Sequence, residues 1–75
     1  MSHSKKYIVV NCNGRRPLFL KRLEEENRVW SYNLESAQKY SRSQINKIIR
    51  HKLWKPGHWE IMSEKMTLIY TIMHT

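Results

Sequence analysis

The hydrophobic period of this chain changes once, near Asn33, and that change constrains the fold more than any other feature of the sequence. Before Asn33, short runs rich in β-branched and aromatic residues alternate along the chain, as strands do. After Ser41, apolar residues recur at three and four positions, which is typical of one face of a helix. We therefore expect an α+β fold in which an antiparallel sheet is followed by a helix.

Three strands are predicted before the change of period, over residues 6–12, 18–23 and 28–32. Asn13-Gly14 follows the first run, and this dipeptide supplies the positive φ angles of a two-residue hairpin turn. The acidic run Glu24 to Glu26, with Asn27, predicts a polar turn between the second strand and the third. The simplest arrangement of these three strands is an antiparallel meander.

The helix is predicted to begin at Ser41, because Gln44 three residues later completes a capping box. Lys55-Pro56-Gly57 is predicted to end it. One apolar stripe on this helix is expected to be buried against the sheet, and it consists of Ile45, Ile48, Ile49 and Leu53.

Two further runs follow, over residues 58–62 and 67–73. The first predicts a closing strand in which Trp59 fills the core. The second carries no charge on either face, and such a strand left at a sheet edge is an aggregation template. We therefore expect residues 67–73 to be paired centrally in the sheet or to meet a second copy of the chain in a homodimer.

The complete fold prediction is a small antiparallel sheet of three to five strands packed against one main α-helix. The elements are expected in the order β-β-β-α-β, with an optional last strand. Residues 6–75 are expected to form a single domain after a flexible leader at residues 1–5.

The charge of the chain is strongly basic, with 14 Lys and Arg against 6 acidic residues and a formal net charge of +8. No acidic residue lies between Glu35 and Glu60, so the helix lacks the opposite-charge pairs that usually support an exposed helix. Such a surface suits phosphates or the carboxylates of a partner, and the simpler alternative is a solvated face. The candidate binding residues are Arg42, Lys47, Arg50, His51, Lys52, Trp54 and Lys55, with Arg15 and Arg16 from the sheet region.

Trp54 is the expected anchor of this surface. If the helix continued to residue 54, the Trp54 side chain would lie opposite the isoleucine stripe and be exposed. Alternating aromatic and cationic residues around Pro56-Gly57 also suit the stacking of bases beside phosphates.

Several chemistries are excluded by composition, because the chain has no aspartate, 2 glycines and 1 cysteine. These counts allow no disulfide within the chain, no Gly-rich phosphate loop and no paired-cysteine zinc site. Cys12 and the histidines His3, His51, His58 and His74 show no paired ligand spacing, so we expect no metal and no cofactor. His58 and Glu60 share one strand face, which is as typical of a surface contact as of catalysis, and we expect no catalytic residue and no enzyme.

The chain has no signal-like segment, since the apolar run after the polar N-terminus spans only Tyr7 to Val10. Its longest uncharged segment, residues 66–75, is shorter than the roughly 20 residues that a membrane-spanning helix needs. A cytoplasmic protein without a membrane partner is expected.

Residues 34–41, with the sequence LESAQKYS, follow the strand that bears Trp30 and lead into QINKII at 44–49. This order resembles small uncharacterised domains encoded by phages and prophages, in which a tryptophan-bearing strand is followed by a short turn, a helix and a closing strand. The resemblance covers roughly residues 6–62 and implies an accessory protein of a mobile element. The chain departs from the acidic helix face of such domains at Lys47, Arg50 and Lys52, and no catalytic residue is carried over.

Two classes of function follow. The preferred one is a small basic non-catalytic protein, encoded by a phage or mobile element, that binds and inhibits or modulates a host protein or nucleoprotein complex in the host cytoplasm. The alternative is a protein that binds DNA or RNA directly through the basic helix around residues 39–55, although no helix-turn-helix, zinc finger or RNP-type strand is present in the sequence.

Overall fold

The computed structural model describes residues 5–74, which form a four-stranded antiparallel sheet and two α-helices. The strands are β1 (Tyr7–Asn11), β2 (Leu18–Glu24), β3 (Asn27–Ser31) and β4 (Trp59–Ser63). The helices are α1 (Arg42–Ile49) and α2 (Glu64–Met73), with a short 3₁₀ turn η1 (Leu34–Ser36) before α1. The predicted α+β class and antiparallel sheet are confirmed, and the expected leader at residues 1–5 lies, apart from Lys5, outside the described residues.

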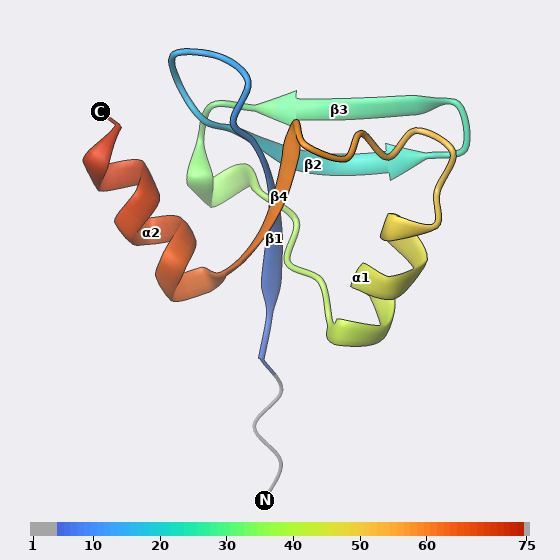
Figure 1. Cartoon of the computed structure of the whole chain (residues 1–75). Coiled ribbons are helices and arrows are strands. Elements are labelled where there is room, and N and C mark those ends of the chain that lie inside the picture. The colour runs from blue at the N-terminus through green and yellow to red at the C-terminus, as the bar shows by residue number, and fades with distance from the viewer. Residues whose placement is uncertain (1–4, 75) are drawn as a thin grey trace, which may run out of the picture.

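The strand order is β3-β2-β1-β4, so β1 is central and the closing strand pairs with the first (Figure 1). β1 and β4 pair over their full length, from Tyr7 opposite Ser63 to Asn11 opposite Trp59. The last two residues of β1 pair with the first two residues of β2, where Val10 lies opposite Phe19 and Asn11 opposite Leu18.

Alternate residues of β1 point to two separate cores, one on each face of the sheet. Val9 packs with Trp59 and with Ile45 of α1 on one face. Ile8 and Val10 pack on the other face in a second cluster. Tyr70 of α2 packs against this second cluster, so the two helices cover opposite faces of the sheet (Figure 1).

The predicted capping box of α1 is confirmed. The Gln44 N–H donates to Ser41 Oγ at 3.3 Å, and the Ser41 N–H donates to Gln44 Oε1 at 2.8 Å. Both groups are thereby satisfied at the first turn of the helix.

The isoleucine stripe is confirmed only in part. Ile45 and Ile48 are 3% and 8% exposed, whereas Ile49 is 44% exposed, so the prediction that Ile49 is buried is wrong. The helix ends at Ile49, earlier than the predicted stop at Lys55-Pro56-Gly57. A short helix that turns Ile45 and Ile48 toward Trp59 leaves the adjacent Ile49 at the edge of the contact, and Leu53 packs from the following turn instead.

The prediction of a last strand at residues 67–73 is wrong, because these residues form most of α2. Ser63 caps the helix by accepting the Met66 N–H at 3.2 Å. The hydroxyls of Thr67 and Thr71 donate to the carbonyls of Ser63 and Thr67, each at 2.7 Å. Threonine in a helix has this option for its hydroxyl, which offsets its preference for strands. A homodimer built on a 67–73 strand therefore has no strand to use.

The prediction of a two-residue turn at Asn13-Gly14 is also wrong. Residues 12–17 connect β1 to β2, and within residues 5–74 only Gly57 has a positive φ, at 84°. Asn11 Oδ1 accepts the Asn13 N–H at 3.0 Å in a local turn. Because Pro17 has no N–H, it cannot extend the ladder beyond Leu18, and the connection stays open. The acidic turn between β2 and β3 falls where it was predicted.

None of the helices in the described part of the chain is long and apolar enough to span a bilayer.

Candidate anion-binding surface

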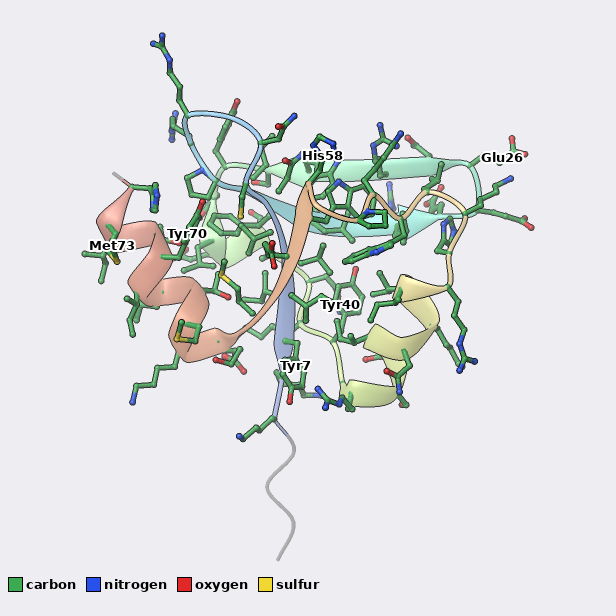
Figure 2. The ribbon with its side chains drawn as sticks, in the orientation of Figure 1. Tyr7, Glu26, Tyr40, His58, Tyr70 and Met73 are labelled. Atoms are coloured by element: carbon green, nitrogen blue, oxygen red, sulfur yellow. The ribbon has the colours of Figure 1, made fainter. Side chains whose placement is uncertain are left out.

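The basic residues of α1 do not form one cluster. Lys47 and the C-cap residue Arg50 are exposed toward the C-terminal end of the helix. Arg42, at its start, places Cζ 5.6 Å from the centroid of the Tyr7 ring. Tyr7 lies at the start of β1 (Figure 2), so Arg42 contacts that end of the sheet, whereas Lys47 and Arg50 lie farther along α1.

The segment after α1 runs past the β2–β3 hairpin before it enters β4 (Figure 1). Lys52 Nζ lies 3.5 Å from Glu26 Oε1 of that hairpin, and both side chains are largely exposed. His51 Nδ1 accepts the Leu53 N–H at 3.0 Å, which uses this ring nitrogen to shape the turn. Lys52 therefore contacts the β2–β3 hairpin, and His51 shapes the turn within the segment itself.

The prediction that the Trp54 side chain is exposed is wrong, because this side chain is half-buried. Its ring meets the Trp59 ring edge to face, with centroids 5.3 Å apart and planes at 89°. Trp54 is half-buried against the α1-side core. Because α1 ends at Ile49, the chain turns before residue 54, and the helical extrapolation that placed Trp54 on the outer face does not apply.

A cavity of about 230 Å³ lies where β1 ends, β3 begins and the last loop enters β4. Figure 2 shows His58 at the entry of β4, at the opposite end of the sheet from Tyr7. The lining residues come from three separate segments, and they are Asn11, Asn13, Arg28, Lys55, His58 and Trp59. We call this group the polar cavity.

Backbone contacts join two of these segments, the end of β1 and the last loop, and close the loop on itself. The Cys12 N–H donates to the His58 carbonyl at 3.1 Å, which joins the end of β1 to the last loop. The N–H groups of His58 and Trp59 both donate to the Lys55 carbonyl, at 3.2 and 3.1 Å. Gly57 lies inside this turn with a φ of 84°, a conformation that L side chains rarely adopt.

The lining of the polar cavity carries cations and no carboxylate. Arg28 Cζ lies 5.8 Å from the centroid of the Trp59 ring. This cation–π contact orients the guanidinium group beside the cavity. Asn11 already uses Oδ1 to accept the Asn13 N–H, so its amide nitrogen remains as a donor. The arrangement therefore offers hydrogen-bond donors and positive charge, which together suit an anion.

Arg15 and Arg16 lie in the loop that also supplies Asn13 to the polar cavity. Arg16 places Cζ 4.6 Å from the centroid of the exposed Tyr32 ring. Of the residues predicted for binding, the structure places only Lys55 in the lining itself.

Sequence reasoning missed Arg28, His58, Asn11 and Asn13 as members of one site. The positive charge of Arg28 and the position of His58 beside Trp59 were visible in the sequence. Their proximity depends on the strand order. This order places the end of β1 beside the start of β4 and pairs β3 with β2. No local pattern encodes that order.

A second cavity, of about 610 Å³, lies between η1 and α2, with Ile8, Leu34 and Leu68 among its lining residues. Lys39 Nζ and Glu64 Oε2 form an ion pair of 3.3 Å at this cavity. Within residues 5–74, no group of three or more His, Cys, Asp or Glu side chains is placed to hold a metal ion.

Comparison of the chain with protein-family models, with curated proteins and with solved structures finds no match. The resemblance of residues 6–62 to phage-encoded domains stays a prediction.

Proposed function

We propose that this chain is a small non-catalytic protein that binds the phosphates of nucleic acid. The binding surface consists of four exposed cations, Lys47, Arg50 and Lys55 along the path from α1 to β4 and Arg28 at the start of β3, together with the exposed His58 side chain. We call this set the basic surface.

The observation that carries the proposal is that the four Lys and Arg residues of the basic surface are exposed and have no carboxylate partner among the described residues. Arg22, Lys39 and Lys52 each form an ion pair with a glutamate. Among residues 5–74, no carboxylate oxygen lies within ion-pair distance of Lys47, Arg50, Lys55 or Arg28. Cations without carboxylate partners can meet phosphates without first giving up a contact, and phosphate contacts supply most of non-specific nucleic-acid binding.

The position of Trp54 favours phosphates over a protein partner at this surface. Protein interfaces depend on a few well-packed anchors, commonly Trp, Tyr or Arg. Trp54 was the expected anchor, and its half-buried packing against Trp59 leaves less of its ring available to a partner. The same packing takes Trp54 away from bases, so we expect binding with little sequence preference.

The host-directed role and the cytoplasmic setting expected from the sequence belong to this proposal. A nucleoprotein complex exposes phosphates, and a protein with a net charge of +8 is attracted to them. Modulation of such a complex would then follow from occupation of its nucleic acid.

The test is the affinity for a fluorescently labelled single-stranded oligonucleotide of mixed sequence at low salt. The double variant Lys47→Glu with Arg50→Glu should lose binding by about 100-fold or more, because two attractive contacts become repulsive. It should keep its fold, since both side chains are exposed. The control is Lys65→Glu on α2, which changes charge on the other face of the sheet.

Equal binding by the wild type and the double variant would overturn the proposal, and so would an absence of binding by the folded wild type. A control that loses as much affinity as a single Lys47→Glu variant would show a response to net charge alone and would also count against a defined surface.

A protein partner remains a second candidate, favoured by the exposed side of α2. Large apolar side chains gather there: Met66, Leu68, Ile69, Ile72 and Met73 are between 42% and 73% exposed. Exposed apolar patches of this kind often mark protein contacts. Capture of a protein from nuclease-treated lysate by the wild type, but not by a Leu68→Glu variant, would support this second function.

A further inference from the structure

The size of the polar cavity limits what can enter it. Its volume of about 230 Å³ falls below the roughly 300–1,000 Å³ of pockets that enclose drug-sized ligands. It therefore suits one compact group of a larger molecule. Trp59, the apolar member of the lining, is 4% exposed and offers little area for stacking.

The donors of the cavity match a compact anion. Arg28, Lys55 and His58 approach from β3 and from the last loop, and Asn11 adds an amide nitrogen from β1. Arginine presents several N–H donors in a planar fork, and lysine presents a point charge. A phosphate group accepts hydrogen bonds at each of its oxygens and binds best where several cationic donors converge.

The cavity is built on fixed parts of the fold. Arg28 is held against the ring of Trp59, which in turn meets Trp30 and Trp54 at centroid distances of 5.0 and 5.3 Å. The loop that carries Lys55 and His58 is closed by backbone hydrogen bonds to the Lys55 carbonyl. Binding therefore needs little reordering of the backbone around the cavity, which favours affinity.

We infer that the polar cavity binds a phosphate monoester, the group found at a phosphorylated end of a nucleic-acid strand and on a mononucleotide. This inference rests on the proposed function and names the group that the basic surface recognises most strongly. A monoester carries about 1.5 to 2 negative charges near neutral pH and three free oxygens. An internal phosphodiester carries one charge and brings two ester substituents, which the small cavity accommodates less well.

The experiment compares two oligonucleotides of identical sequence and label, one with a 5′-phosphate and one with a 5′-hydroxyl. We expect the phosphorylated strand to bind the wild type about tenfold more tightly, as charge-assisted hydrogen bonds of typical strength predict. Adenosine monophosphate at millimolar concentration should compete with the phosphorylated strand, whereas adenosine should not. Competition by the mononucleotide and by inorganic phosphate distinguishes the whole nucleotide from the phosphate group alone.

The variants Lys55→Gln and His58→Gln should each reduce the preference for the phosphorylated strand, so that the two strands bind with nearly equal affinity. The matched control Lys47→Gln should weaken both strands equally and leave the preference intact, because Lys47 does not line the cavity. Two independent variants keep the test valid if one of them fails to fold, which far-ultraviolet circular dichroism detects.

Equal affinity of the wild type for both strands would overturn the inference. If both strands then bind and both respond to Lys47→Gln, the proposed function stands without the phosphate site. If neither strand binds, the proposed function fails together with the inference. A preference that survives both cavity variants would place the phosphate elsewhere and would also overturn the inference.

Discussion

The guanidinium of Arg28 lies over the indole ring of Trp59, with 5.8 Å between Arg28 Cζ and the ring centroid. Trp59 is 4% exposed and belongs to the core on the α1 side of the sheet. One contact therefore joins the most buried tryptophan to a cation of the basic surface. We therefore expect a change at Trp59 to alter the position of Arg28 in the polar cavity.

Trp59 should be among the least replaceable residues of the chain. It meets Trp30 and Trp54 edge to face and begins β4 opposite Asn11. Trp59→Ala should lower the free energy of unfolding by about 3–5 kcal/mol, the usual range for a buried aromatic residue. Urea denaturation followed by far-ultraviolet circular dichroism measures this loss. A change below about 1 kcal/mol would show that the tryptophan cluster contributes little to the core.

Ile48 and Ile49 form a matched pair with the same chemistry and different burial. Ile48 is 8% exposed and packs against the core, whereas Ile49 is 44% exposed. Ile48→Ala should lower the free energy of unfolding by about 2–5 kcal/mol. Ile49→Ala should cost less than about 1 kcal/mol, because the Ile49 side chain buries less apolar area on folding than the Ile48 side chain does. Equal losses in the two variants would mean that α1 is rotated from the orientation described.

The features that sequence reasoning placed correctly depend on residues close together in the chain. Ser41 and Gln44 contact each other within one helical turn, so their spacing is sufficient evidence for the start of α1. The burial of Ile45 and Ile48 follows from the same short period.

The features that it misplaced depend on competition between signals or on tertiary structure. In α2, the β-branched residues favour a strand, and the opposing signal is the single N-cap Ser63. The hairpin signal of Asn13-Gly14 is overridden by Pro17, which cannot donate to the ladder. The polar cavity joins Asn11, Arg28 and Lys55 from three segments, and only the strand order brings them together.

Tyr40 should make the stability of the chain depend on alkaline pH. Burial raises the pKa of Tyr40 above its usual value of about 10. The unfolded chain therefore releases this proton at a lower pH than the folded chain. The contribution of Tyr40 is fully present below pH about 10 and is lost as pH rises through the folded-state pKa.

The variant Tyr40→Phe should remove this contribution, so it should lose less stability than the wild type between pH 9 and 11. Urea midpoints of both proteins across this range provide the measurement, and lysine deprotonation cancels in the difference. Tyr70, whose pKa is raised first by its hydrogen bond with Cys12, is common to both proteins and also cancels. Parallel stability curves for the two proteins would contradict the burial of the Tyr40 hydroxyl.

Phosphate binding by the basic surface should appear in the salt dependence of nucleic-acid affinity. For the wild type, the logarithm of the association constant should fall linearly with the logarithm of salt concentration. Lys47→Gln, Arg50→Gln and Lys55→Gln should each reduce the steepness of that line by about 0.7 to 0.9, since each lost phosphate contact retains that many counterions. Lys65→Gln should leave the slope unchanged. Slopes identical to that of the wild type in all three surface variants would show that these residues do not contact phosphates.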